Sequence, residues 1–523
     1  MAETLAGATL VLMLMNMTAR LLGFFRETAV AAIYGASGFT DAYQVAYTLP
    51  YFLQMVLGMA LVSSIVPVIV HNINMGKKKE AWEAASVTIN LTVILMVVLA
   101  ALGVVFSRLL VNLTAPELPA DTSALAASMT AIMFPSVIFM SAAMLITGIL
   151  NACKRFALAA FAPAFSSLVI IIGVVAFGGR YPMALPVATL ISFVGMLLIQ
   201  LPGLAGTGFR YHFSLNLKNP DVQNVFRNLG AVFLGTATYQ IYLAINRFFA
   251  SGLEVGSISA LNYAGKLMNL PLGIFVASVA SAIFPILSAQ ALEKDRRPMW
   301  ESLDRGLKLV FLITLPAALG LMALGQPIVQ LLFQRGAFDA QDTVMTAQAL
   351  FWFGPGMAGM AATQILTRAY YAMGDSKTPM LTGLVSILVN IIASRALMGS
   401  LGPGGLSLAN SLASLFNAGC MYVLLRRRLP GHEGKSLGAT TLKALAASLA
   451  TAAAAVFAYR ELAAALGLSL DAGGLKLALG VAGAIAAGVA AYVIVIFLLK
   501  ENELLMFARQ LTGRGRGRKE EKP

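Results

Sequence analysis

Two arginines and a glutamate lie within the first long apolar segment of the chain, where lipid would favour uncharged side chains. Arg20, Arg26 and Glu27 all fall in the stretch TARLLGFFRETAVAAIYG. A charge at the centre of a membrane helix costs about 2.5–3.5 kcal/mol on insertion scales, so we expect charges retained there to have a use. A guanidinium stays charged and presents a planar fork that matches phosphate oxygens. This stretch therefore predicts a buried site for an anion.

Further cations fall inside later apolar segments. Arg247 lies in the seventh segment, Lys266 in the eighth, and Arg368 near the cytoplasmic end of the tenth. Each could instead snorkel or belong to an internal ion pair, and for Arg368 we favour that interpretation. Asp41 and Glu27 are the nearby acids, yet cations outnumber acids in the expected core. The set suits a polyanion and disfavours an exporter of organic cations.

Other kinds of chemistry have weaker support in the sequence. The three histidines, His71, His212 and His432, are scattered in or near loops, and the two cysteines, Cys153 and Cys420, are far apart. The chain has no GxxxxGK[ST] loop for nucleotide phosphates. We therefore expect no catalytic residues, no bound metal and no cofactor.

The composition is that of a polytopic α-helical membrane protein. Of 523 residues, 59% are hydrophobic and only 11% are charged, and the mean hydropathy is +0.80. Soluble domains carry about 25% charged residues. The net charge of +14 comes mostly from loops between apolar runs, so it predicts membrane topology rather than nucleic-acid binding.

Fourteen apolar segments are long enough to cross a bilayer core of about 30 Å. They are 5–33, 39–70, 84–113, 122–152, 157–178, 182–205, 223–250, 258–290, 304–332, 341–373, 377–398, 403–425, 438–462 and 473–499. Alternate loops are basic, for example Lys77–Lys79 and Arg426–Arg428, whereas TAPELPADT after the third segment lacks Lys and Arg. The positive-inside rule therefore predicts that both termini are cytoplasmic.

The two halves of the chain resemble each other, with matching residues 221 or 218 positions apart. The matched pairs are Arg26 and Arg247, Pro50 and Pro271, Pro67 and Pro285, and Trp82 and Trp300. Six helices per repeat is an even number, so both repeats should have the same orientation, as in rocking transporters. Gly23, Pro50 and Pro271 are expected to bend helices.

This pattern predicts five parts. They are a first lobe (1–205), a cytoplasmic linker (206–222), a second lobe (223–428), two additional helices (429–500) and a basic cytoplasmic tail (501–523).

Several motifs together resemble the MurJ/MviN family of lipid II flippases, within the superfamily of multidrug and polysaccharide exporters. They are RLLGFFRETAVAAIYGAS, TDAYQVAYTLP, GILNACKRFALAAFAP, GSISALNYAGKLMNLPLGIF, LLFQRGAFDAQDT and RAYYAMGDSKTP. The resemblance covers segments one to about twelve. It implies two six-helix lobes forming a V-shaped central cavity that is cationic, with the last two helices forming a groove for a prenyl tail.

The resemblance also assigns site residues. Arg20 and Arg26 match the two arginines of helix one, Asp41 matches the acid that opens helix two, and Lys266 stands where many members have Arg. Arg247 is a weaker candidate from the internal repeat.

The chain also departs from the family pattern. Gln54 and Met55 replace an arginine pair, and Asn269 replaces a common glutamate. Asn246 stands where some members carry an aspartate implicated in sodium binding, so coupling to a monovalent ion is left open.

The expected function is translocation of an undecaprenyl-pyrophosphate-linked peptidoglycan precursor, lipid II, across the inner membrane of a bacterium. The expected partners are lipid II and membrane lipids, with cell-wall synthesis proteins left open. Alternatives are an exporter of another polyprenyl-pyrophosphate-linked polysaccharide unit, and a non-transporting scaffold for cell-wall enzymes. An enzyme of lipid-linked sugar chemistry would need acidic residues in large outer loops, which the chain lacks.

Overall fold

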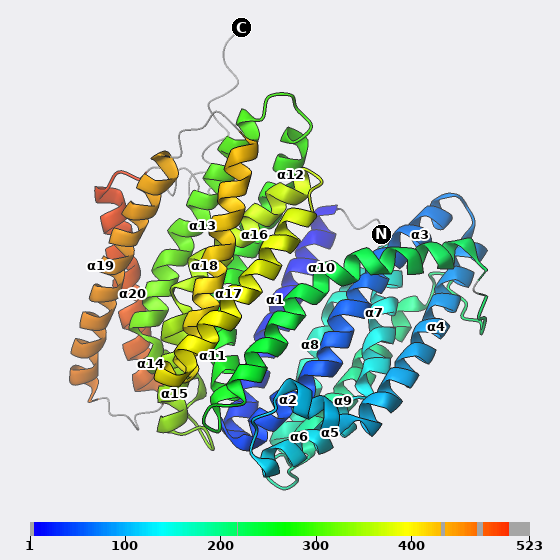
Figure 1. The fold of residues 1–523 in the computed structure, drawn as a ribbon, viewed down its shortest axis with the longest axis horizontal. Helices are drawn as coiled ribbons and strands as arrows, with labels where there is room; N and C mark the ends of the chain where they lie inside the picture. The colour runs from blue at the N-terminus through cyan, green and yellow to red at the C-terminus, as the bar shows by residue number, and fades with distance from the viewer. Residues whose placement is uncertain (1–4, 217, 430–434, 468–473, 502–523) are drawn as a thin grey trace. The chain divides into compact units, whose positions relative to one another are not determined.

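The computed structural model describes residues 5–216, 218–429, 435–467 and 474–501, and within these ranges every regular element is a helix (Figure 1). A helix pairs its backbone groups internally, which a chain surrounded by lipid requires. Ten helical spans of the described residues are long and apolar enough to cross a membrane, or eleven if one pair bent by 44° counts as a single span. The all-helical membrane architecture is confirmed, and the count of fourteen spans stays a prediction.

The helices gather into two compact units. The first contains Met1–Ser259 and the short segment Arg335–Phe338, and the second contains Ala260–Gln334 and Asp339–Pro523. The predicted division into two lobes at the linker 206–222 stays a prediction. The predicted basic tail, 501–523, lies outside the described residues apart from Glu501.

The first unit is built from ten α-helices within the described residues. They are α1 (Leu5–Tyr34), α2 (Gly38–Leu53), α3 (Met59–Asn74), α4 (Lys78–Val105), α5 (Ser107–Thr114), α6 (Ala120–Met133), α7 (Ser136–Ala152), α8 (Phe156–Phe177), α9 (Ala184–Leu198) and α10 (Pro220–Ala250). The closest pairs are α1 with α8, α8 with α9, and α2 with α6. Helix α10 follows the linker and packs against α3, α4 and α5.

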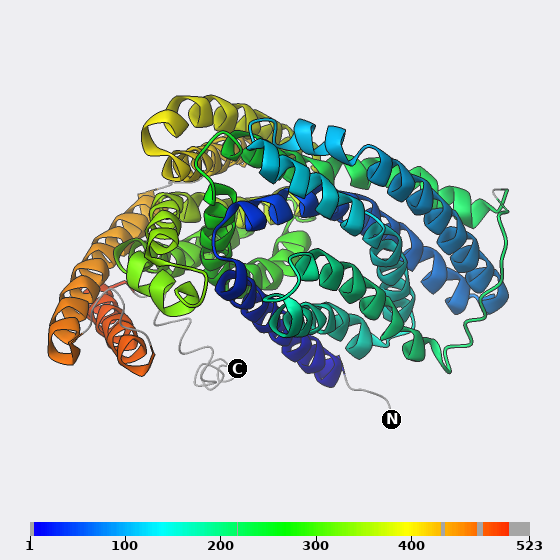
Figure 2. The same ribbon diagram turned by 90° about the horizontal axis from the view of Figure 1, so that it is seen from below.

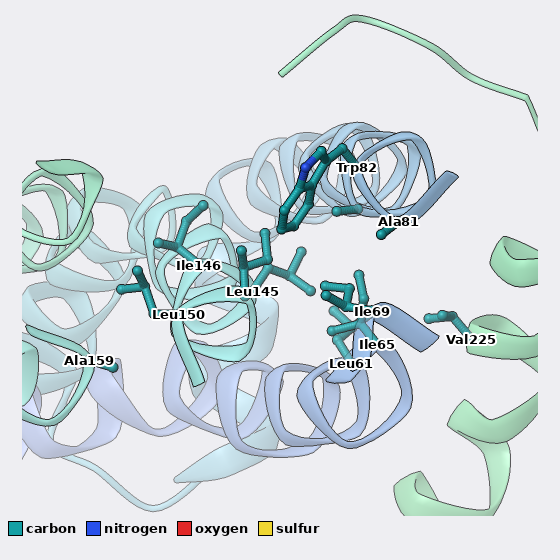
Figure 3. Packing of buried hydrophobic residues seen from close by; sticks show 12 residues of the cluster. Leu61, Ile65, Ile69, Ala81, Trp82, Leu145, Ile146, Leu150, Ala159 and Val225 are labelled. Atoms are coloured by element: carbon teal, nitrogen blue, oxygen red, sulfur yellow. The ribbon is translucent and has the colours of Figure 1, made fainter. Parts of the chain in front are cut away.

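A buried apolar cluster joins α3, α4 and α7 at one end of the first unit (Figure 3). Trp82 of α4 stands over Leu145 of α7 and meets the ring of Phe209 edge-on, with the ring centroids 5.5 Å apart. Phe209 belongs to the linker, so the linker is packed into the unit by its own aromatic side chain.

The linker runs as a loop from the end of α9 to the start of α10 (Figure 2). Polar side chains of α4 and α3 bond to it and to the start of α10. The side-chain amide of Asn90 donates to the carbonyl oxygen of Ser214 at 2.9 Å and accepts from the Tyr211 hydroxyl at 2.7 Å. Where α10 begins, Asn72 of α3 donates to the Asp221 carboxylate at 2.8 Å. Because both the linker and the start of α10 are bonded to the first unit, α10 is fastened to that unit at this end.

The second unit is also helical throughout its described residues. Its helices are α11 (Ser257–Pro271), whose first three residues belong to the first unit, α12 (Ala277–Gln290), α13 (Arg297–Ala323), α14 (Gly325–Phe333), α15 (Ala340–Phe353), α16 (Gly356–Ala372), α17 (Lys377–Leu401), α18 (Pro403–Arg428), α19 (Lys435–Leu466) and α20 (Leu475–Leu498). The last two lie side by side (Figure 1).

Small residues permit the close helix pairs of this unit. A Cβ added to Gly356 or Gly359 of α16 would come within 2.7 Å of backbone atoms of α18. Gly488 of α20 faces Ala455 and Thr451 of α19, at 3.2 Å from the position of its missing Cβ. Helices in lipid associate mainly by such close packing, because lipid tails are as apolar as the side chains and the hydrophobic effect does not drive helices together there.

Each repeat contains a π-helix at or just after its matched proline. Pro50 lies in α2 and is followed by the π-helix Gln54–Gly58, and Pro271 ends α11 and is followed directly by the π-helix Leu272–Val276. Proline lacks the N–H that an α-helix needs and clashes with the preceding turn, and π-turns are one way to accommodate the disturbance. Helix α1, by contrast, runs without a break through Gly23.

Candidate anion-binding site

Arg26 forms an ion pair with its neighbour Glu27. The guanidinium donates to Glu27 Oε1 at 2.6 Å, and the two side chains are 22% and 7% exposed. A carboxylate at this distance offsets much of the charge of the guanidinium. Arg26 nevertheless keeps further N–H donors, because a guanidinium has five.

Arg247 lies against α2, within the same unit as Arg26. Its guanidinium donates to the backbone carbonyl oxygen of Gln44. Both arginines lie close enough to Tyr43 and Tyr47 of α2 to interact with them electrostatically. The fold thus gathers at α2 two cations that are 221 positions apart in sequence.

Arg20 and Lys266 are placed differently. Arg20 is exposed on α1 and lies six residues before Arg26, which turns it about 120° around the helix. Lys266 is an exposed residue of α11 in the second unit. Grouping these two cations with Arg26 in one site stays a prediction.

Asp41 accepts hydrogen bonds at the start of α11. It is 3% exposed, and its carboxylate accepts from the backbone N–H groups of Gly256 at 2.7 Å and Ser259 at 2.8 Å. The Ser259 hydroxyl donates to it as well, at 2.7 Å. The first N–H groups of a helix lack partners within the helix and carry partial positive charge, so a carboxylate there acts as a cap. The geometry therefore gives Asp41 a structural role, and its predicted contact with substrate stays a prediction.

Two glycines bring other loops against the end of α1. Gly336 has a φ of +62°, and a Cβ added to it would lie 2.1 Å from the carbonyl oxygen of Ala32. The next residue, Ala337, donates its N–H to that same oxygen at 2.8 Å. Gly256, with a φ of +93°, approaches the carbonyl oxygen of Ala36 equally closely. Only glycine fits such contacts, which explains the glycine in the QRGAF motif.

Helix α2 carries a row of tyrosines that the charges in the sequence do not predict. Tyr43, Tyr47 and Tyr51 are spaced four apart, and their rings stack at centroid distances of 6.0 and 5.3 Å. The spacing in TDAYQVAYTLPYF places them on one helix face and could have indicated this row.

The remaining candidates bear on metal or ion coupling. Asn246 donates its side-chain amide to the Tyr242 carbonyl oxygen of its own helix at 3.0 Å. Within the described ranges, no three His, Cys, Asp or Glu residues come together as a metal site would require.

The fold is shared with known membrane transporters. A multidrug resistance MATE family transporter of the MOP superfamily, in an inward-facing conformation, matches with a TM-score of 0.67 at 14% identity over 82% of this chain and 98% of that one. A lipid II flippase MurJ in an inward closed conformation matches with a TM-score of 0.78 at 24% identity, over 95% of this chain and 100% of that one. The class is therefore a multi-pass helical membrane protein that has the same fold as these two proteins.

Sequence similarity narrows this class to one family. The family described as Lipid II flippase MurJ matches residues 30–472. The lipid II flippase MurJ of Burkholderia cenocepacia is 30% identical over 439 residues, which cover 81% of this chain and 83% of the relative. The chain belongs to the Lipid II flippase MurJ family, as the sequence motifs predicted, and as a multi-span member of this bacterial family it is an inner-membrane protein.

Proposed function

We propose that this protein moves lipid II, the undecaprenyl-pyrophosphate-linked peptidoglycan precursor, from the inner to the outer leaflet of the cytoplasmic membrane. Its relatives bear the name lipid II flippase. The observation that carries the proposal beyond the family name is the convergence of Arg26 and Arg247 at α2. Two guanidiniums in an apolar protein suit a pyrophosphate, which offers several charged oxygens to forked donors. No bond of the substrate is made or broken, so the protein is a transporter and not an enzyme.

The other predicted residues have complementary roles in this proposal. Arg20 and Lys266 add positive charge along the path of the head group. Asp41 stabilises the start of α11 as a helix cap. Helices α19 and α20 offer an apolar surface for the prenyl tail, which includes the exposed side chains of Leu449 and Phe457.

The proposed orientation places both termini in the cytoplasm. Basic loops of the first unit meet at one end, since Lys78 and Arg155 both act electrostatically on Cys153. Partial burial raises the pKa of this thiol, and the two cations act in the opposite direction. Arg155 also donates to the carbonyl oxygens of Gly203 and Ala205, at 3.1 and 2.6 Å, next to the linker. The basic loops that contain Lys78 and Arg155 thus lie at the same end of the first unit, which supports the assignment of that end to the cytoplasmic side.

Membrane potential can return the empty protein to its inward-facing state in this proposal. Moving one charge across the full membrane is worth about 2.3 kcal/mol per 100 mV. Unoccupied arginines are drawn toward a negative interior, and a bound pyrophosphate cancels that force. Asn246 supplies an amide and not a carboxylate at that position, and coupling to a monovalent ion is kept as an alternative to the membrane potential.

The proposal is tested by reconstituting the purified protein in vesicles loaded with labelled lipid II and measuring its exposure to a reagent that cannot cross the membrane. Arg26→Gln and Arg247→Gln should each slow this exposure. Each change removes charge-assisted hydrogen bonds and should weaken binding of lipid II roughly ten- to hundredfold. Arg180→Gln, a change of an exposed loop arginine, is the matched control and should leave transport unchanged.

Three results would contradict the proposal. Wild-type vesicles that expose no lipid II would point to a scaffold. Faster transport of another polyprenyl-pyrophosphate saccharide would identify a different cargo. If Arg26→Gln is rescued fully by adding Glu27→Gln, the ion pair is only a brace and Arg26 does not bind substrate.

A further inference from the structure

The tyrosine row of α2 has features that helix packing alone does not require. Residues four apart rise about 6 Å along a helix, so Tyr43, Tyr47 and Tyr51 span about 12 Å of one face. Their rings are nearly parallel, with interplanar angles of 23° and 25°. The row therefore presents three phenol hydroxyls in a line beside one another.

The three hydroxyls are not equivalent. Tyr43 is buried, and its hydroxyl is hydrogen-bonded to Thr189 Oγ1 of α9 at 3.0 Å. The rings of Tyr47 and Tyr51 are half-buried and pack against the apolar cluster that includes Phe193. Among the residues that the structure describes, neither of these two hydroxyls has a hydrogen-bond partner. Packing thus fixes two rings whose hydroxyl groups are available to a ligand.

The charged neighbours of the row suggest the chemistry of that ligand. Arg247 and Arg26 both lie within electrostatic reach of Tyr43, Tyr47 and Tyr51. A guanidinium can only donate hydrogen bonds, which suits phosphate oxygens. A phenol hydroxyl can both donate and accept, which suits the hydroxyl and amide groups of a saccharide. The two kinds of side chain side by side fit a ligand in which a phosphate and a sugar are joined.

We infer that the hydroxyls of Tyr47 and Tyr51 bind the saccharide attached to the pyrophosphate and so determine head-group selectivity. The inference rests on the proposed function, because the arginines must hold the pyrophosphate for the sugar to lie beside the row. Tyr47 and Tyr51 are four residues apart and are therefore separated by about 6 Å along the helix axis. This distance is comparable to the width of a pyranose ring, so both hydroxyls can contact a single sugar.

The test compares the binding of two lipids by the purified full-length protein. The lipids are undecaprenyl pyrophosphate and the same lipid bearing its disaccharide-peptide head group, and binding is measured by titration in detergent. Tyr47→Phe and Tyr51→Phe, singly and together, should weaken binding of the saccharide lipid about two- to tenfold per hydroxyl and leave the bare pyrophosphate lipid unchanged. Each change removes a hydroxyl and keeps the ring, so thermal stability should not fall.

Tyr43→Phe is the matched control, because its hydroxyl is already bonded to Thr189. It should lower thermal stability without changing the ratio of the two affinities. If the double variant does not fold, the single variants provide the same comparison.

The outcomes separate this inference from the proposed function. An unchanged ratio of affinities in Tyr47→Phe and Tyr51→Phe would overturn the inference alone, as would an equal loss for both lipids, which would assign the hydroxyls to the phosphates. A wild-type protein that binds neither lipid would overturn the proposed function and, with it, the assignment of these tyrosines.

Discussion

The cap that Asp41 places on α11 makes a prediction whose size follows from three hydrogen bonds. The carboxylate accepts from the N–H groups of Gly256 and Ser259 and from the Ser259 hydroxyl, at 2.7–2.8 Å. A hydrogen bond to a charged acceptor contributes about 1.5–3 kcal/mol, and the charge near a helix N-terminus adds about 0.3–1 kcal/mol. Asp41→Asn keeps one acceptor oxygen but turns an NH₂ group toward one of the donors. We expect it to lower the free energy of unfolding by about 2–4 kcal/mol.

A double-mutant cycle checks that this loss comes from the cap. Ser259→Ala alone removes a bond to a charged oxygen and should cost about 1.5–3 kcal/mol. In the Asp41→Asn background the same change should cost about 1 kcal/mol less, because a neutral amide oxygen is the weaker acceptor. The free energies are measured by equilibrium unfolding in mixed micelles. If the two changes add to within about 0.3 kcal/mol, the residues do not act as one unit and the reasoning is wrong.

The other predictions concern three separate contacts. Gly336→Ala should lower the free energy of unfolding by at least about 1 kcal/mol, because φ at this position is positive and the new Cβ would meet a backbone oxygen of α1. Gly179→Ala is the control and should leave the free energy of unfolding unchanged, because its added Cβ would have no neighbour within 4 Å. Partial burial by itself would raise the pKa of the Asp375 carboxyl, but hydrogen bonds from Thr378 and from Arg428 lower it from 3.8 to about 2. Its stabilising effect should therefore be complete above about pH 4 and be lost as the pH falls toward 2, and a pH series of thermal unfolding on Asp375→Asn should lack that acid-side dependence. Trp82→Ala should lower the free energy of unfolding by about 3–5 kcal/mol and increase proteolytic cleavage within the linker 206–222, because it removes the ring that packs against Phe209. Cleavage at the wild-type rate would show that the polar contacts of Asn90 are sufficient to hold the linker.

The helices could be predicted from the sequence because lipid imposes one simple demand, a long apolar run. Each of the fourteen predicted segments coincides with a helix or with two consecutive helices in the structure. The breaks within segments were harder to foresee. The segment 84–113 is divided at Phe106, although no proline lies there and the nearest glycine, Gly103, lies inside α4. Tertiary packing sets such breaks, so hydropathy alone does not locate them.

The candidate site was predictable in its charges but not in its pairings. Arg26 and Arg247 could be found because buried charge is expensive in lipid, and the repeat linked them. The partner of Asp41 could not be found, because Gly256 and Ser259 are more than 200 positions away and carry no distinctive chemistry. The tyrosine row could have been found from its spacing, but aromatic residues four apart on a helix are also ordinary packing residues.

The two π-helices change which way the following helix faces. A π-turn holds one residue more than an α-helical turn needs, and one begins four residues after Pro50 and another directly after Pro271. One additional residue corresponds to about 100° of rotation around a helix axis. The side chains of α3 and of α12 therefore face a direction different from the one that an unbroken α-helix would give them, and a substitution that restored regular α-helical turns would redirect the whole of either helix.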